Sequence, residues 1–386
     1  MMQISTKKSA LVVPQTFAND FGKGGLNFAH GVVRSEGDPV YFSHMRKGKP
    51  LLNAALQASL LDAEPAKLAG KWLYLGGVYN HFGHFVAESI HRAWAWRQYG
   101  QDCCGVVMLP KLKRFQTRYR MPDYAKDLLG LFGLEERHLH FVTELTEVEE
   151  LLIPEPGSQL FLLPSEEYIR FLASLDLPRH LAAQPLPEGF TPKVMVSRQH
   201  YRLYGAIAGL GALEQRLAQE GYFIFCPEQY PVATQLKVYL QAERLIFEEG
   251  SALHLLELLA EIKAEVLVIE RRLNAKASPF DSVLAMRAPH YRKYSQAVAL
   301  PPLSTAKFAG ANTLSVLDLT ALAEFLVQHG FASPALLQGF TWQPQAKNDV
   351  LDYLLVRSNP PAPGFDGCVL GYLQSVQEIF KNLAEK

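Results

Sequence analysis

The chain has 386 residues, of which 48% are hydrophobic, so it is long enough for two or three domains that each bury a core. Lysine and arginine number 38, as do aspartate and glutamate, and this balance excludes a global field that would attract nucleic acid. Any site for an anion must therefore be built locally.

The N-terminal segment carries lysines but has only a short apolar run before Pro14, which is too short for the apolar region of a signal peptide. No apolar stretch reaches the roughly 18 residues that a membrane helix needs. We therefore expect a cytoplasmic protein, with room for peripheral contact at the inner face of the membrane. The four cysteines include no CxxC spacing, which favours reduced thiols over a disulfide framework or a zinc ribbon.

Short strands and helices alternate along the first half of the chain. A helix is expected at 124–132, and apolar runs predict strands at 11–13, 39–42, 72–75, 105–109, 140–142 and 150–153. The run at 72–75 ends at a glycine pair and leads into another predicted helix. Strand, helix and strand at this spacing suit a parallel crossover, so the first half predicts an α/β layer fold.

The helix expected after the glycine pair has two chemically different faces. At 100° per residue, Val86 and Ile90 lie on one side, whereas His84, Glu88 and His91 lie on the other. Ionisable groups near the positive end of a helix are typical of a cleft. A solvated surface helix is the alternative, and a His–Glu pair one turn apart favours it when taken alone.

A segment rich in proline and alanine between Pro178 and Pro192 indicates a linker between domains. After it, strands are predicted at 193–198, 222–225, 244–247 and 266–269, with helices between them. This alternation predicts a doubly wound parallel sheet, which binds ligands outside the carboxyl ends of its strands. We expect an N-terminal domain at 1–187, a second domain at 188–300, and a mixed or helical C-terminal extension at 301–386.

The strand at 244–247 leads into a helix start that suits an anion. The amides of Ser251 and Ala252 would be free donors, and Gly250 would let a ligand approach the backbone. A plain helix cap formed by Ser251 is the alternative. The GxGxxG and GxxxxGK[ST] fingerprints are absent from the sequence, which argues against a dinucleotide dehydrogenase and a P-loop NTPase.

The strand at 193–198 ends in Ser197 and Arg198, with Arg202 four residues on. These side chains would point into the same crevice, and the planar fork of arginine matches phosphate oxygens. An exposed loop arginine is the alternative.

A basic segment follows the strand at 105–109, with Phe115 and Tyr119 between its cations. It contains Lys111, Lys113, Arg114, Arg118 and Arg120. This segment suits an anionic acceptor or lipid headgroups. A solvated loop is the alternative.

In this order the pieces resemble glycosyltransferase family 61, the family of bacterial capsular polysaccharide biosynthesis proteins. The segment from His81 to Glu88, with Arg92 and Trp94 after it, is similar to the first motif of that family. The strand ending at 197–198, with an arginine at 202, is similar to the second motif, and the turn at 249–254 to the third. Two features depart from the family pattern: His81 stands in place of an Asn, and no Asn-Glu pair occurs at 205–211.

The resemblance implies two facing Rossmann-like domains of the GT-B type. It also implies an inverting transfer from a nucleotide sugar to a glycan or lipid-linked glycan, in the synthesis of capsule, lipopolysaccharide or another cell-surface polysaccharide. The expected donor-binding residues are Ser197, Arg198, Arg202, Gly250, Ser251, Ala252 and His254. The expected acceptor-binding residues are His81, His91, Arg92, Lys113 and Arg114. No Asp-x-Asp motif occurs, so we expect no metal and no other cofactor.

An inverting displacement needs one base on the acceptor side. We expect His84 to be that base, because the helix N-terminus keeps it neutral and Glu88 can hold its ring; Glu88 as the base is the alternative. A metal-dependent hydrolase that uses His84, Glu88 and His91 as zinc-site residues is a rival hypothesis. A sugar- or nucleotide-binding protein without catalysis is another.

Overall fold

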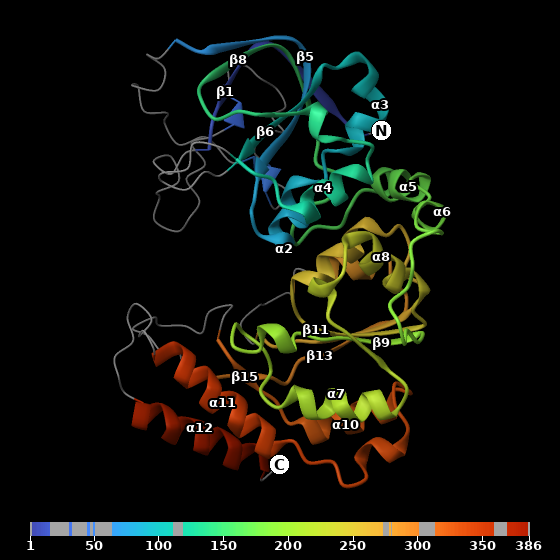
Figure 1. Ribbon diagram of the computed structural model, residues 1–386, viewed down its shortest axis with the longest axis vertical. Helices are drawn as coiled ribbons and strands as arrows, with labels where there is room; N and C mark the ends of the chain where they lie inside the picture. Colours follow the sequence, from blue (N-terminus) through green and yellow to red (C-terminus); the bar gives the residue numbers. More distant parts are fainter. Residues whose placement is uncertain are drawn as a thin grey trace.

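The computed structural model describes residues 2–15, 31–32, 45–46, 49–50, 64–110, 119–272, 278, 280–300, 313–358 and 369–384. Its six-stranded sheet lies in the upper part of the view in Figure 1 and its five-stranded sheet in the lower part, with helices between the sheets and below the second one. The predicted α/β class is confirmed. We refer to residues up to 187 as the N-terminal half and to the later residues as the C-terminal half.

The first sheet has six strands in the order β2-β1-β8-β5-β6-β7. They are β1 (Ile4–Val13), β2 (Gly31–Val32), β5 (Ala66–Val78), β6 (Gly105–Pro110), β7 (Leu139–Phe141) and β8 (Thr146–Pro154). The four strands from β8 to β7 run parallel, whereas β1 is antiparallel to both β8 and β2. The sheet is therefore mixed, because the N-terminal strand adds to a parallel set in the opposite direction.

The second sheet is wholly parallel, in the order β10-β9-β11-β12-β13. Its strands are β9 (Lys193–Val196), β10 (Phe223–Phe225), β11 (Arg244–Glu248), β12 (Glu265–Ile269) and β13 (Tyr291–Tyr294). The first four were predicted; β13 was not, since this edge strand is polar and only half-buried. The strand order reverses between β9 and β11, which is where doubly wound sheets bind ligands.

The two faces of the second sheet are covered by different helices. Met195, Ile246 and Leu267 pack in one apolar cluster with α7 (Leu210–Gln219), α10 (Leu319–Gln328) and α11 (Gln343–Ser358). Val196 and Phe247 point to the other face, as alternation along a strand requires. They join a cluster that runs through α8 (Val232–Gln241) and the 3₁₀ helix η7 (Ser251–Leu258) into the N-terminal half.

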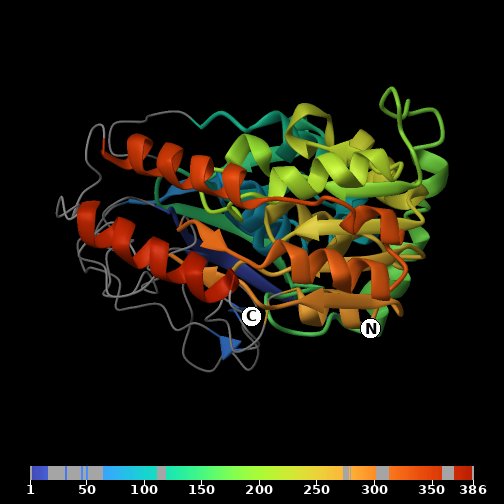
Figure 2. The same cartoon turned by 90° about the horizontal axis from the view of Figure 1, so that it is seen from below.

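The remaining elements are short or peripheral. Helix α12 (Val369–Ala384) lies beside α11 on the outer side of the second sheet (Figure 2). The other elements are α4 (Asp123–Gly130), α5 (Glu166–Ser174), α6 (Leu177–His180), α9 (Asp281–Ala285), the 3₁₀ turns η3 (Gly100–Asp102), η4 (Glu136–His138), η5 (Gln199–Tyr201), η6 (Pro227–Gln229) and η8 (Pro334–Leu337), and the paired strands β3 (Met45–Arg46) with β4 (Lys49–Pro50) and β14 (Val298–Ala299) with β15 (Ser315–Val316). No helix among the described residues is both long enough and apolar enough to span a bilayer.

The single helix expected after the glycine pair is broken into three pieces. These are α2 (Phe82–His84), a π-helical turn η2 (Phe85–Ser89) and α3 (Trp94–Tyr99), with a turn at 90–93. The prediction of one continuous amphipathic helix was therefore wrong. A π turn changes the angle between successive residues, and as a result His84 is exposed while His91 is buried.

Helix α2 and turn η2 pack against η7, and α4 packs against α8. These contacts join the two halves at the carboxyl-end edge of the second sheet. The proposed linker also packs on the C-terminal half, because Lys237 Nζ donates to the carbonyl oxygens of Ala182 and Gln184 at 2.7 and 2.5 Å. The domain boundaries and the GT-B arrangement stay predictions.

Candidate active site

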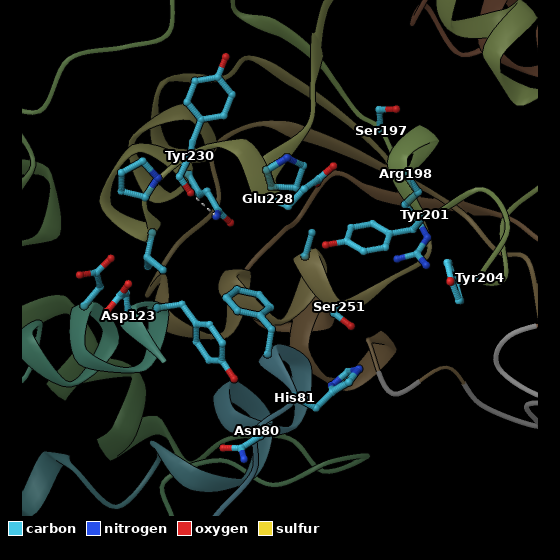
Figure 3. Close-up of a pocket in the computed structure, with 18 residues that line it drawn as sticks. Asn80, His81, Asp123, Ser197, Arg198, Tyr201, Tyr204, Glu228, Tyr230 and Ser251 are labelled. Atoms are coloured by element: carbon cyan, nitrogen blue, oxygen red, sulfur yellow. Dashed lines mark hydrogen bonds between the residues drawn. The ribbon is translucent and has the colours of Figure 1, made fainter. Parts of the chain in front are cut away.

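A cavity of about 670 Å³ lies between the two halves (Figure 3). Its lining comes from the start of α2, from α4 and α8, and from the segments that follow β9, β10 and β11. The lining residues are Asn80, His81, Phe82, Asp123, Tyr124, Asp127, Ser197, Arg198, Tyr201, Tyr204, Pro227, Glu228, Tyr230, Pro231, Val232, Gln235, Ser251 and Ala252. The cavity thus lies at the carboxyl ends of the parallel strands, next to the reversal in strand order.

Two glycines bring the three sequence motifs into contact. A Cβ atom at Gly83 would lie 2.9 Å from His254 Cδ2 and 3.0 Å from Ser251 Oγ, so the start of α2 touches the start of η7. A Cβ atom at Gly250 would collide with the guanidinium of Arg198. Glycine is needed at both positions because a side chain would separate the segments. Residues far apart in the sequence therefore meet at one edge of the cavity.

Arg198 is positioned to meet a ligand in this cavity. Its Nη2 donates to the carbonyl oxygen of Gly205 at 3.3 Å, and its guanidinium carbon lies 5.9 Å from the ring centre of Tyr201. Its Nε is buried and has no acceptor among the described residues. Buried N–H groups are normally satisfied, so this guanidinium has capacity for an additional anionic partner.

Two buried carboxyl groups, Glu214 and Glu248, lie near Ser197 and Arg198 respectively. Burial raises the pKa of Glu248 to about 7, although the charge of Arg198 opposes the shift. Burial also raises the pKa of Glu214 to about 8. A hydrogen bond from Ser197 opposes this shift, and repulsion from Glu248 adds to it. Glu248 Oε1 accepts a hydrogen bond from the amide of Ile207 at 2.8 Å, which fixes the chain after β9.

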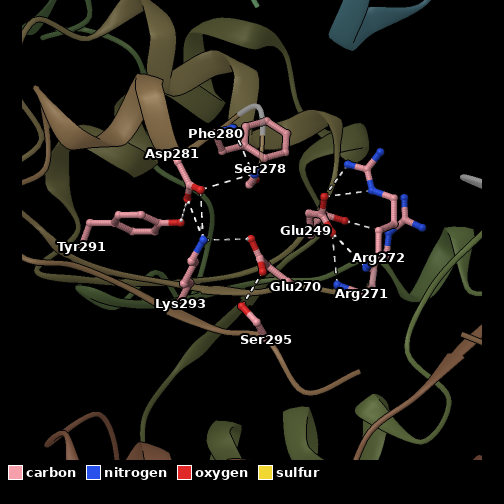
Figure 4. Close-up of polar contacts among 10 residues, drawn as sticks. All are labelled: Glu249, Glu270, Arg271, Arg272, Ser278, Phe280, Asp281, Tyr291, Lys293 and Ser295. Carbon is pink, nitrogen blue, oxygen red and sulfur yellow. Dashed lines mark hydrogen bonds and ion pairs between the residues drawn. The ribbon is translucent and has the colours of Figure 1, made fainter. Parts of the chain in front are cut away.

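Two further arginines, which were not predicted, follow β12 (Figure 4). Arg271 Nε donates to the carbonyl oxygen of Glu249 at 2.9 Å, and Arg272 Nε donates to Glu249 Oε1 at 2.8 Å. Burial lowers the pKa of Arg271 to about 10, and the charges of Arg198 and Arg272 contribute. Arg271 therefore lies close to Arg198 and Arg272 at the carboxyl-end edge of the sheet, where Glu249 forms an ion pair with Arg272. Residues 197–198 were predicted because ligands bind at the carboxyl ends of parallel strands, and the same argument would have predicted residues 271–272.

His84 and Glu88 form a solvent-accessible pair. The distance from His84 Nδ1 to Glu88 Oε1 is 2.7 Å, and the side chains are 48% and 12% exposed. The His84 ring lies 5.1 Å from the ring of His81, which lines the cavity; His84 and Glu88 are not lining residues themselves. Burial lowers the pKa of His81, and the charges of His84, His254 and Arg198 contribute. A carboxylate that holds Nδ1 of His84 leaves Nε2 to accept a proton.

A second histidine–glutamate pair is buried where the halves meet. Glu257 Oε1 lies 2.6 Å from His254 Nδ1, and its Oε2 lies 2.9 Å from His91 Nε2. The Nδ1 atom of His91 lies 2.8 Å from the hydroxyl of Tyr168. Burial alone would raise the pKa of Glu257, but its hydrogen bonds with His254 and His91 outweigh burial and hold this pKa well below the usual range.

Residues 82–261 match the family model of glycosyltransferase 61. The matched segment begins in α2 and ends after η7, so it covers the three motifs and most of the cavity lining. The match agrees with the family resemblance that the sequence predicted and supports a transferase. The bacterial capsular subtype stays a prediction. No curated protein sequence matches the chain.

Within the matched segment, two of the expected contact residues are engaged elsewhere. His91 is 1% exposed and uses both ring nitrogens in the contacts to Tyr168 and Glu257. Arg92 is also buried, with its guanidinium 5.9 Å from the ring centre of Tyr74. Neither residue lines the cavity, so the structure places both behind the wall rather than at its surface.

The other predicted residues divide into three groups. Ser197, Arg198, Ser251 and Ala252 line the cavity, whereas Gly250 and His254 lie directly behind that lining. Arg202 turns away from it and pairs with Asp352 of α11 at 3.2 Å. Lys113 and Arg114, together with most of the basic segment and the strand expected at 39–42, lie outside the described residues.

The structure does not assemble the three residues of the hydrolase hypothesis. His84 is exposed and paired with Glu88, while His91 is buried and paired with Glu257. A histidine whose two ring nitrogens are both engaged offers no lone pair to a metal. The hypothesis failed because it relied on a regular helix through residues 84–91.

Proposed function

We propose that this protein is a glycosyltransferase that moves a sugar from a nucleotide-sugar donor to a hydroxyl group of a glycan acceptor, with inversion at the anomeric carbon. The observation that carries the proposal is the meeting of the three motifs at one cavity, at the reversal in strand order. The family match over the same residues supports it.

The C-terminal half is proposed to bind the donor. Arg198 has unused donor capacity at the cavity wall, and Ser251 lies at the start of η7, where backbone amides lack partners within the helix. Both features suit the two phosphates of a nucleotide sugar. Tyr201 and Tyr204 are exposed at the same wall and suit stacking against a base or sugar ring.

The N-terminal half is proposed to bind the acceptor and supply the base. His84 takes the proton from an acceptor hydroxyl while the hydroxyl oxygen attacks the anomeric carbon. The bond from that carbon to the diphosphate breaks, and Arg198 stabilises the negative charge on the departing phosphate. Glu88 orients the His84 ring and stabilises the imidazolium formed by proton transfer. No metal takes part in this scheme.

The acceptor proposal extends to Asp123 and Asp127 of α4, which line the cavity opposite the donor residues. Carboxylates at such a position suit hydrogen bonds from sugar hydroxyl groups. A lipid-linked acceptor, and a role in capsule, lipopolysaccharide or another surface polysaccharide, remain part of the proposal, as does a cytoplasmic location at the inner face of the membrane.

Calorimetry with nucleoside diphosphates tests the donor assignment. We expect the parent to bind at least one of UDP, GDP, ADP and dTDP, and we expect Arg198→Ala to bind it more weakly. Arg202→Ala is the matched control, since Arg202 pairs with Asp352 outside the cavity. Equal affinity of the parent and Arg198→Ala would contradict the assignment.

A further inference from the structure

A separate cluster of metal-ligating side chains lies at the rim of the cavity. His200 of η5, Cys226 at the end of β10 and Glu228 of η6 bring one ligand atom each within 4.8 Å of one another. His200 Nδ1 lies 2.6 Å from Glu228 Oε1. Of the parts of the chain that the structure describes, this is the one group of three or more His, Cys, Asp and Glu residues that meets this distance.

We propose that His200, Cys226 and Glu228 form a zinc site. Thiolate, imidazole and carboxylate together suit Zn²⁺, whereas Mg²⁺ and Ca²⁺ prefer oxygen ligands alone. Three protein ligands leave one of four tetrahedral positions open. The thiol of Cys226 is free of any disulfide, and a bound metal would displace its proton to the solvent and take the thiolate as a ligand.

The backbone holds these ligands together in the absence of a metal. The two ligand-bearing segments follow the neighbouring parallel strands β9 and β10, and the amide of Ser197 donates to the carbonyl oxygen of Phe225 at 2.8 Å. Each ligand segment is closed by a tight turn, in which Tyr201 N donates to Arg198 O at 2.7 Å and Tyr230 N donates to Pro227 O at 3.0 Å. Only small side-chain movements are then needed to bring the three ligand atoms to one ion.

A metal bound at this site would affect one wall of the cavity. Glu228 lines the cavity itself, and so do Arg198 and Tyr201 from one ligand segment and Pro227 and Tyr230 from the other. A bound ion would tie the segment after β9 to the segment after β10 and fix this wall. The site is distinct from the proposed transfer chemistry, which uses His84 and Arg198. It also departs from the expectation of a protein without metal, because its ligands follow different strands and form no short motif.

Cobalt substitution tests the site directly. We expect Co²⁺, added to the reduced full-length chain, to produce near-ultraviolet absorption from thiolate-to-cobalt charge transfer that saturates at about one equivalent. Cys226→Ser should abolish this absorption. Cys104→Ser, which removes another free thiol that is exposed, should retain it. His200→Ala should retain the thiolate but weaken Co²⁺ binding by more than about tenfold, since even the loss of an outer partner commonly has that effect.

A thermal measurement provides a second readout. Zn²⁺ should raise the melting temperature of the parent and of Cys104→Ser but not of Cys226→Ser, because a ligand stabilises only the folded state that binds it. Equal melting temperatures of parent and Cys226→Ser without metal would show that the variant folds. The proposal is overturned if the parent gives no thiolate absorption, or if the absorption survives in Cys226→Ser. Neither result bears on the glycosyltransferase proposal.

Discussion

The pairs His84–Glu88 and His254–Glu257 have nearly the same separation but differ in exposure. The distance from ring nitrogen to carboxylate oxygen is 2.7 Å for His84 and Glu88, and 2.6 Å for His254 and Glu257. Glu257, however, is 2% exposed and also bonds His91. The contrast teaches that a short contact does not define a role. The accessible pair suits proton exchange with a substrate, whereas Glu257 of the second pair joins the two halves through its contact with His91.

Removal of Glu257 should have the largest effect on stability. Glu257→Ala leaves His91 and His254 buried without their common partner, and breaking a buried charged pair typically costs about 3–5 kcal/mol. Glu88→Ala, which breaks the pair whose histidine is 48% exposed, should cost less than Glu257→Ala. Urea unfolding of the three proteins measures both values. Similar losses in the two variants would remove the distinction between the pairs.

Removal of His84 should have the largest effect on turnover among folded variants. His84→Ala should lower kcat by about 10²-fold or more, the contribution of a general base, with donor affinity unchanged. His254→Ala tests the buried pair in the same assay and should alter the melting temperature as well as the rate. If His84→Ala keeps nearly parental kcat while Glu88→Gln is inactive, the role of base passes to Glu88.

Arg198 and Arg202 allow a similar comparison for the binding of an anionic ligand. Arg198→Ala should weaken nucleoside diphosphate binding by about 1.5–3 kcal/mol, the range for a hydrogen bond to a charged group. Arg202→Ala should change it little, because Arg202 pairs with Asp352 at the molecular surface. Calorimetry under matched conditions checks both. A larger loss in Arg202→Ala would reassign the donor contact.

Glu214 sharpens the comparison because it is buried without a histidine partner. Burial raises its pKa from 4.5 to about 8, so between these values the folded state binds more protons than the unfolded state, and stability falls as pH rises. Glu214→Gln removes this cost. The difference in the free energy of unfolding between Glu214→Gln and the parent should therefore grow by at least about 1 kcal/mol as the pH rises from 5 to 8.5. Melting curves across that range test whether the stabilisation grows with pH. A stabilisation that shrinks with rising pH would contradict the prediction.

The sequence predicted the second sheet well because its central strands are buried on both faces. Val194 to Val196 and Val266 to Ile269 are continuous apolar runs, which is the pattern of a buried parallel strand. Because the carboxyl ends of such strands share one edge, the positions of Arg198 and Ser251 followed from their place in the sequence. The edge strand β13 was missed because it lacks an apolar run.

Long-range contacts and local irregularity could not be predicted. The π turn at 85–89 moved His91 into the core, and no periodicity in the sequence signals such a turn. Arg202 was assigned to the donor, but its partner Asp352 lies 150 residues away on α11. The contact of His91 with Glu257 likewise joins residues 166 apart. Such partners are set by the packing of the two halves rather than by local sequence.

Turnover of nucleotide sugars tests the central proposal most directly. The parent, His84→Ala and Arg198→Ala would each be incubated with UDP-, GDP-, ADP- and dTDP-linked sugars and mixed glycan acceptors, and the released nucleoside diphosphate would be measured. We predict release by the parent from at least one donor, a loss of about 10²-fold or more in His84→Ala, and weaker donor binding in Arg198→Ala. A folded parent that binds nucleotide but releases none from any donor would contradict the proposal and leave a binding protein without catalysis.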